Sequence, residues 1–192
     1  MALSPQENGD GAPVASSLVL MKDQYLIDAD DPLHDLDTPS AKAFAVRDRN
    51  NQDARLFALI CTPGLPTRIG LMRELRGDAT PGILPLVEWD TVFWPPISQE
   101  TMVVVYRRPL GGRVTNAIDA SKYKINEYEI QESFIDPIYG ALKTLSHRGI
   151  FHREIRADNL FFMDEDLTDV VLGDCVTCPP GFNQPGVYES LE

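Results

Sequence analysis

The stretch from Gly149 to Asn159 most constrains what this chain can fold into, because it is a dense run of charged and polar residues that leads directly into an apolar run. It reads Gly-Ile-Phe-His-Arg-Glu-Ile-Arg-Ala-Asp-Asn and is followed by the apolar run Leu160–Met163. A second apolar run, Val170–Leu172, leads directly into Gly173 and Asp174. Short apolar runs separated by polar turns predict strands. We therefore expect a charged loop followed by two short strands.

This order resembles the catalytic loop of the protein kinase superfamily, in which His-Arg-Asp is followed by four residues and an Asn. His152-Arg153-Glu154 keeps that spacing with one acid changed, and Asn159 falls at the metal-binding Asn. Asp174-Cys175-Val176 resembles a degraded Asp-Phe-Gly motif, and Ser190-Leu191-Glu192 is similar to the Ala-Pro-Glu that ends a kinase activation segment. The resemblance implies a kinase-like fold over residues 18–192.

The fold class expected from this resemblance is α+β, with two lobes and a tail. Residues 1–17, rich in Gly, Pro, Ser and Ala, are expected to form a disordered tail. Residues 18–110 should form a five-stranded antiparallel amino-terminal lobe with one helix, ending in a hinge. Residues 111–192 should form an incomplete, mainly helical carboxy-terminal lobe, because the resemblance stops where a kinase continues into its large helical subdomain. We expect either a fragment of a longer protein or a shortened fold.

Local patterns place the elements. Apolar runs are strand candidates, and they lie at residues 18–21, 25–27, 43–46, 56–61, 83–89 and 102–106. Residues 66–76 predict a helix, because Ile69, Met72 and Leu75 fall at helical spacing. A longer apolar stripe predicts a helix over 128–147, which Pro137 should kink or locally open.

Several parts that position a nucleotide in a kinase are altered here. The segment from Asp28 to Asp37, where a Gly-rich loop would cover the phosphates, has no Gly and five Asp. Cys61 stands at the position of the strand Lys, so no ammonium would reach the phosphates. Tyr106 would be the gatekeeper, and Arg107 would begin the hinge against which an adenine ring lies.

The flanking positions are altered as well. Glu74, the only acid in the first helix, is more plausibly solvated than paired with a catalytic Lys. Arg113 stands at the ribose edge, where many kinases present an acid.

Other parts survive. Asn159 and Asp174 carry the oxygen ligands that hard cations prefer, so a divalent cation is conceivable if a nucleotide binds. Glu154 stands at the position of the catalytic base, but its side chain is one methylene longer than Asp, and small positioning errors are costly in catalysis. Arg156 keeps a positive charge where kinases often face the transferring phosphate with Lys.

These losses favour a catalytically inactive pseudokinase that acts as a regulatory or protein-interaction module. No cofactor is expected on that interpretation. The alternative is a divergent, weakly active protein kinase that uses Glu154 and Arg156 and binds ATP with Mg²⁺ or Mn²⁺. A third hypothesis, redox or zinc chemistry at Cys175 and Cys178, is weaker because the chain has three Cys and no second paired set of ligands.

Charge and hydropathy narrow the partners. The net charge of −12 argues against nucleic acid and anionic membranes as partners. No apolar run approaches the length of about 18 residues that spans a bilayer, and residues 1–17 lack the pattern of a signal peptide, so a cytoplasmic location is expected. An uncovered apolar face on the helix at 128–147 would favour a protein partner, self-association or another domain of a longer chain.

Overall fold

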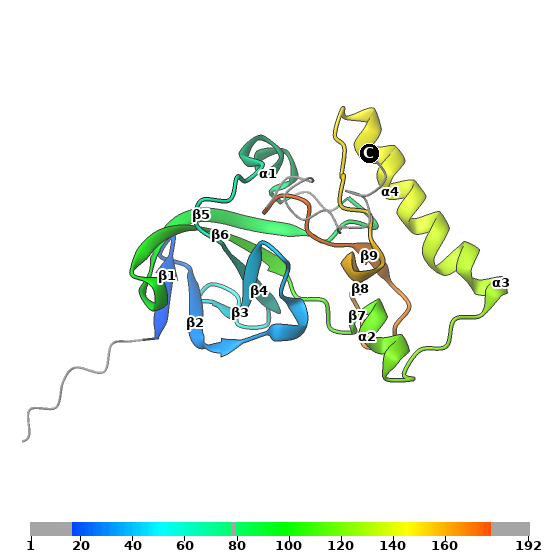
Figure 1. The fold of residues 1–192 in the computed structure, drawn as a ribbon, viewed down its shortest axis with the longest axis horizontal. Coiled ribbons are helices and arrows are strands. Elements are labelled where there is room, and N and C mark those ends of the chain that lie inside the picture. The colour runs from blue at the N-terminus through cyan, green and yellow to red at the C-terminus, as the bar shows by residue number, and fades with distance from the viewer. Residues whose placement is uncertain (1–16, 78–79, 178–192) are drawn as a thin grey trace, which may run out of the picture.

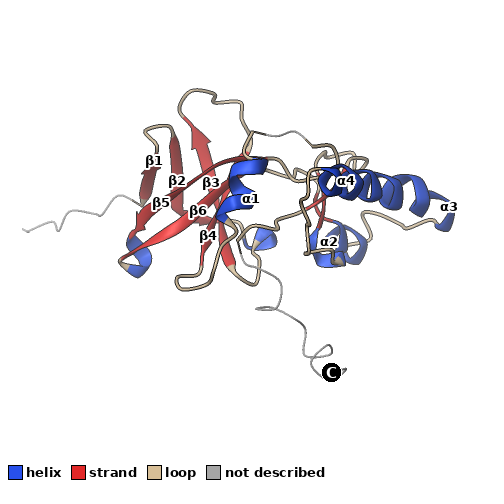
Figure 2. Ribbon diagram, turned by 90° about the horizontal axis from the view of Figure 1, so that it is seen from above, coloured by secondary structure: helices blue, strands red, loops and turns tan. Residues whose placement is uncertain are grey.

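The computed structural model describes residues 17–77 and 80–177. A large antiparallel sheet forms one end of the molecule, and a long helical segment forms the other (Figure 1). Between them lie a small sheet and the segment that contains His152. Seen from above, the long helix extends away from the large sheet (Figure 2).

The large sheet has six strands, in the order β1-β2-β3-β4-β6-β5, and all its pairs are antiparallel. Their bounds are β1 (Leu18–Met21), β2 (Tyr25–Pro32), β3 (Ala41–Asp48), β4 (Leu56–Cys61), β5 (Leu86–Trp94) and β6 (Gln99–Arg107). All six strand candidates therefore belong to one sheet, and the expected number of five was wrong. The run at 83–89 begins its strand only at Leu86, while Ile83 makes an isolated parallel bridge to Leu172.

The additional strand is β1, which forms a hairpin with β2. The turn residues Lys22 and Asp23 both have positive φ, 51° and 55°, the conformation that suits a tight hairpin. Lys22 also reaches the opposite edge of the sheet, because its Nζ lies 2.9 Å from the Glu88 carboxylate on β5. The two edges of the sheet thus approach each other, and the sheet curls.

Strand β4 is buried on both faces. Because side chains alternate along a strand, Leu56, Ala58 and Ile60 pack inside the curled sheet. Its other face points toward the rest of the molecule, with Phe57, Leu59 and Cys61 in a second core. The large sheet is therefore the common wall of two hydrophobic clusters.

A single short helix and the carboxy-terminal part complete the second core. Helix α1 (Ile69–Leu75) buries Leu71, Met72 and Leu75 against it. The remaining elements are β7 (Gly112–Arg113), α2 (Val114–Asp119), α3 (Glu127–Ile130), α4 (Asp136–His147), β8 (Leu160–Phe162) and β9 (Val170–Leu172). Strands β7, β8 and β9 form a three-stranded sheet in that order. Short 3₁₀ turns lie at His34–Leu36, Pro95–Ile97 and Ala157–Asn159.

The long helix is interrupted before Pro137, in line with the effect expected of this proline. Residues Gln131–Ile135 form a π-helical turn between α3 and α4. Pro137 has no N–H to donate one turn back, so the regular α-helical ladder cannot continue unchanged through this point. In the part of the chain that the structure describes, no helix is both long and apolar enough to cross a bilayer.

Candidate functional site

The candidate site is the junction between the large sheet and the β8–β9 hairpin, where buried side chains of both parts pack together. Beside it, a hollow of about 850 Å³ lies between the β2–β3 turn and the hinge and is lined by residues 32–36, 108–110, Arg55, Gly112 and Glu165. Leu36, at the end of the first 3₁₀ turn, is 5% exposed and belongs to the same buried cluster as Leu59 and Phe161. Phe57 and Tyr106, on neighbouring strands, stack with ring centroids 5.8 Å apart. The acidic segment expected to be one loop is instead divided, because Asp28–Pro32 continue strand β2 and only residues 33–40 turn back to β3.

The backbone of the hinge is occupied by the protein itself. The N–H of Arg107 donates to Pro85 O at 3.0 Å, and that of Arg108 donates to Arg55 O at 2.8 Å. Leu110 N donates to Met163 O at 3.2 Å, and Gly111 N donates to Phe162 O at 3.0 Å. Pro109 has no N–H to offer. Every donor from 107 to 111 is therefore paired or missing, and the side chain of Arg107 is exposed.

Asp174 is the centre of a buried hydrogen-bond network. Its Oδ1 accepts from the Tyr106 hydroxyl at 2.6 Å and from Val176 N at 3.0 Å. Its Oδ2 accepts from the Thr177 hydroxyl at 2.5 Å and from Thr177 N at 3.3 Å. The network reaches the β2–β3 turn, because Ser40 Oγ lies 2.9 Å from Thr177 Oγ1. Burial, with a contribution from the Asp174 charge, raises the pKa of Tyr106 well above its ordinary value, so the phenol stays a donor.

Asn159 and His152 hold the backbone of the charged loop. Asn159 Nδ2 donates to Glu154 O and to Asp174 O, both at 2.9 Å. A Cβ at position 173 would collide with Asn159 and Phe161, so Gly173 permits this close packing. His152 Nε2 lies 3.1 Å from Gly173 O, and its Nδ1 accepts from Glu154 N at 3.3 Å. Burial lowers the pKa of His152 to about 4.

The two residues expected to act in catalysis are paired with each other. Arg156 Nη1 lies 3.2 Å from Glu154 Oε2, and Arg156 Nε lies 3.0 Å from Asp158 Oδ1. Burial raises the pKa of Glu154, whereas the positive charge of Arg156 acts in the opposite direction. The Glu154 carboxylate and the Arg156 guanidinium are thus held in contact, and the Glu154 side chain is 16% exposed.

Two arginines join the amino-terminal part to the charged loop. Arg113, at the end of β7, donates through Nε to Asp35 O at 3.0 Å and through its other nitrogens to Asp37 O and Asp158 O. Its guanidinium also lies 4.9 Å from the centre of the Phe161 ring. Arg68, just before α1, donates to the carbonyl oxygens of Phe151, His152 and Cys175 at 2.8, 3.0 and 3.0 Å. These bonds hold the two parts against each other.

We expect Arg113→Ala to loosen the turn at residues 33–40 without unfolding the sheet. The change removes three donors to backbone carbonyls on both sides of the junction. Amide hydrogen exchange in this turn should accelerate by about tenfold or more, since local opening costs less free energy. Arg47→Ala, at an exposed arginine on β3, is the matched control and should leave the turn unchanged. Equal exchange rates in the two variants would contradict the assigned role of Arg113.

The structure gathers some of the predicted residues and separates others. Glu154, Arg156, Asn159 and Asp174 line one small cavity of about 20 Å³, together with residues 38–40 of the β2–β3 turn. Cys61 is 3% exposed at the end of β4, within the second core and not on this cavity. Glu74 is exposed on α1, and its carbonyl accepts from Arg148 Nη2 at 2.9 Å.

The cysteine pair is only partly described. Burial raises the pKa of Cys175 well above the ordinary value, which keeps it an unreactive thiol. Within residues 17–77 and 80–177, no three His, Cys, Asp or Glu side chains are grouped so that they could hold a metal ion. Cys178 and the motif Ser190-Leu191-Glu192 lie outside the described residues.

Arg68 and Ser40 are the site residues that the sequence reasoning missed. The side chain of Arg68 bonds to residues 84 and 107 positions further along the chain. Ser40 contacts Thr177 across 137 positions. No periodicity or short motif marks such contacts, because they exist only after the two halves have folded together.

Comparison with known proteins gives the fold and nothing finer. No protein-family model and no curated protein matches this sequence. Among solved structures, the chain is similar to the crystal structure of Rad53 1–466 in complex with AMP-PNP, with a TM-score of 0.58 and 18% identity. The match covers 74% of this chain and 36% of that chain. The kinase-like fold predicted from the charged loop is thereby confirmed, and this chain spans about a third of the length of its structural neighbour.

Proposed function

We propose that this kinase-like domain does not transfer phosphate and acts as a regulatory or protein-interaction module. The observation that carries the proposal is the occupied hinge, in which four N–H groups pair internally and Pro109 has none. An adenine ring is recognised by hydrogen bonds as well as by apolar contact, and buried polar atoms of a ligand without partners lower affinity. The side chains of Leu36 and Leu59 belong to the buried cluster of the junction, and Asp35 and Glu165 bring negative charge to the hollow of about 850 Å³ beside the hinge.

The phosphate side of the site supports the same proposal. Cys61 offers no positive charge, and the β2–β3 turn brings carbonyl oxygens and carboxylates instead of a glycine-rich cradle. The carboxylate of Asp174 already accepts four hydrogen bonds, and the Asn159 amide nitrogen is committed to two carbonyls. This arrangement does not fit a nucleotide-bound metal ion without breaking buried hydrogen bonds.

An interaction role has positive support from the surface of the long helical segment. Tyr128, Ile135 and Tyr139 on this segment are 89%, 49% and 65% exposed. Phe151 and Ile155, in the neighbouring loop, are 60% and 57% exposed. Exposed apolar side chains gathered on one part of a protein often mark a contact with another protein or domain. We therefore propose a protein partner, a second copy or another domain as the occupant of this surface.

The alternative, a weakly active kinase, rests on one specific observation. Glu154, Arg156, Asn159 and Asp174 surround the same small cavity. Opening of the junction would expose the Glu154 carboxylate as a candidate base together with the Arg156 cation and two oxygen-bearing side chains. Such an enzyme would need to break the contacts of Arg113 and the network around Asp174 in each cycle.

Thermal unfolding with nucleotide distinguishes the two functions. We expect about 2 mM ATP with excess Mg²⁺ or Mn²⁺ to move the midpoint by less than about 1 °C, since a ligand stabilises only by binding the native state. A ligand at about 100 times its dissociation constant would add about 2.7 kcal/mol, which corresponds to several degrees for a domain of this size.

Adenosine without phosphates serves as the control ligand. A shift of several degrees with ATP and metal would overturn the proposal, and the alternative would then predict phosphate transfer that rises with Glu154→Asp. A shift with adenosine alone would show that the hinge opens to accept a base. The proposal is upheld if neither ligand moves the midpoint.

A further inference from the structure

Two arginines at the outer side of the hinge lack a counter-charge. Arg55 directly precedes β4, and Arg108 directly follows β6. Most other described basic side chains near the sheets have acidic partners, such as Lys22 with Glu88 and Lys42 with Asp37. Within residues 17–77 and 80–177, neither Arg55 nor Arg108 forms a salt bridge or a side-chain hydrogen bond. Both side chains are exposed.

The backbone fixes these two arginines next to each other. Leu56 pairs with Arg107 at the end of the β4–β6 register, and Arg55 and Arg108 are the next residues of the two chain segments beyond this last pair. Arg108 N donates to Arg55 O at 2.8 Å. Directly opposite residues in an antiparallel pair project from the same face, with Cβ atoms about 5 Å apart, and like charges in this arrangement are destabilising. A bound anion would remove that repulsion.

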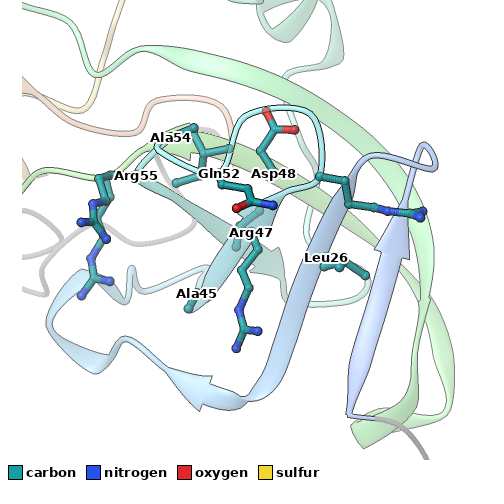
Figure 3. Close-up of a pocket in the computed structure, with 11 residues that line it drawn as sticks. Leu26, Ala45, Arg47, Asp48, Gln52, Ala54 and Arg55 are labelled. Carbon is teal, nitrogen blue, oxygen red and sulfur yellow. The ribbon is translucent and has the colours of Figure 1, made fainter.

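A hollow of suitable shape begins at this pair. Its volume is about 500 Å³, and it lies over β3, the β3–β4 turn and the start of β4 (Figure 3). Arg47 and Arg49 contribute two more positive charges, while Leu26, Ala45 and Ala54 supply apolar surface. A second hollow of about 290 Å³ shares Arg55 and Arg108 and adds Arg107 and Asp53. The pair also lines the hollow of about 850 Å³ beside the hinge, to which Asp35 and Glu165 contribute acids. Arg55 and Arg108 therefore stand where three hollows meet at the edge of the hinge.

The acid in the hollow of about 500 Å³ does not cancel this charge. Asp48 is the one carboxylate that lines it, and its oxygens accept from Gln24 Nε2 at 3.0 and 3.1 Å and from Asn50 N at 2.9 Å. Figure 3 shows Asp48 and Arg47 pointing to opposite sides of the strand. Arg47 is 73% exposed and lies 3.4 Å from Asp28, a long contact that leaves its guanidinium accessible.

We propose that Arg55 and Arg108 bind the phosphate group of a phosphoserine- or phosphothreonine-containing peptide. Guanidinium groups present paired N–H donors that match phosphate oxygens, which favours arginine pairs for this task. An apolar side chain of the same peptide would lie on Leu26, Ala45 and Ala54. A net charge of −12 repels extended polyanions, so a short segment with one phosphate fits better than nucleic acid or an anionic membrane.

This inference rests on the proposed interaction role and names the chemistry of one partner. Its site is the exposed Arg55–Arg108 pair at the edge of the hinge, whereas the nucleotide test concerns the buried junction behind the hinge. Failure of peptide binding would leave the nucleotide result standing, and an unexpected nucleotide shift would leave peptide binding standing.

The test compares pools of synthetic peptides with degenerate flanks and a central phosphoserine, phosphothreonine or unmodified serine. We expect the full chain at about 0.15 M salt to retain a phosphorylated pool about tenfold or more above the serine pool. Arg55→Gln/Arg108→Gln should abolish this difference. Arg73→Gln/Lys143→Gln changes the net charge by the same amount at exposed residues of α1 and α4, and should preserve it.

Three outcomes would overturn the proposal. They are equal retention of the serine pool, equal loss in the two double variants, and displacement of the peptides by inorganic phosphate at equal molar concentration. Both double variants replace exposed side chains, and Arg55→Gln/Arg108→Gln also removes a like-charge repulsion, so neither thermal midpoint should fall below that of the unchanged protein and a loss of binding cannot reflect unfolding. Arg55→Lys/Arg108→Lys keeps the charges without the forked donors and should bind at an intermediate level.

Discussion

Lowering the pH from 7 to 5 should cost this protein about 2 kcal/mol of unfolding free energy through His152 alone. His152 is 2% exposed, and burial lowers its pKa to about 4. Its hydrogen bonds explain why the neutral form is required: Nε2 meets a carbonyl oxygen, while Nδ1 accepts from Glu154 N. A proton on Nδ1 would face that N–H group and break the second bond.

The direction of the effect follows from proton uptake. In the unfolded chain, a histidine takes up its proton near pH 6.5, whereas the folded His152 resists until about pH 4. The unfolded state therefore binds more protons between these values, and stability falls as the pH falls through this window. Buried Glu154 acts in the opposite direction, because its raised pKa lets the folded state take up a proton earlier. Burial raises the pKa values of Asp37 and Glu88, but hydrogen bonds and nearby cations outweigh it and lower them. The contribution of these two carboxylates to stability is therefore still present at pH 5 and is lost only at lower pH.

Urea unfolding at pH 7 and pH 5 measures this loss. His152→Gln should be less stable at pH 7. Its unfolding free energy should differ between pH 7 and pH 5 by about 2 kcal/mol less than that of the unchanged protein, because the titrating ring is gone. His147→Gln, at an exposed histidine in the last turn of α4, is the matched control. An unaltered pH dependence in His152→Gln would mean that folding does not lower the pKa of His152.

The sequence predicts the local elements of this fold well for a physical reason. The continuous apolar run at 56–61 marks a strand that is buried on both faces, and the apolar stripe at 128–147 marks a helix with one packed face. In each case the residues that make up the pattern lie within a few positions of one another along the chain. The expected total of five strands came from the family resemblance, whereas the run at 18–21, itself a strand candidate, pairs with β2 through the tight turn at Lys22 and Asp23 and makes the sixth strand.

The position of the charged loop could be predicted from the sequence, but the hydrogen-bond partners of its side chains could not. His152, Asn159 and Asp174 are brought together, as the motif spacing predicted. What occupies their polar atoms depends on Tyr106, Arg68 and the backbone of the hinge, which come from distant parts of the chain. Motif spacing reports which side chains meet, whereas hydrogen-bond partners are decided by the packing of the two halves.

Asp174→Ala should lower the free energy of unfolding by about 3 kcal/mol or more in the absence of any metal or nucleotide, because several buried donors lose their acceptor. The carboxylate is 8% exposed and accepts from the Tyr106 hydroxyl, from Thr177 twice and from Val176 N. Its removal leaves these buried donors without an acceptor, and each unsatisfied donor lowers the free energy of unfolding. Chemical unfolding measures the loss directly.

Asp164→Ala is the matched control, because Asp164 also accepts from two backbone N–H groups and a threonine hydroxyl, those of Thr168 and Asp169. It lies in the partly exposed turn between β8 and β9, where water can replace the lost acceptor, so its removal should cost about 1 kcal/mol or less. Tyr106→Phe removes a single donor from Asp174 and should fall between the two. A carboxylate whose role is to bind a metal destabilises the protein when the metal is absent, so its removal should cost little free energy of unfolding. A large loss in Asp174→Ala would therefore show that Asp174 stabilises the junction between the two halves. A small loss would contradict this structural role.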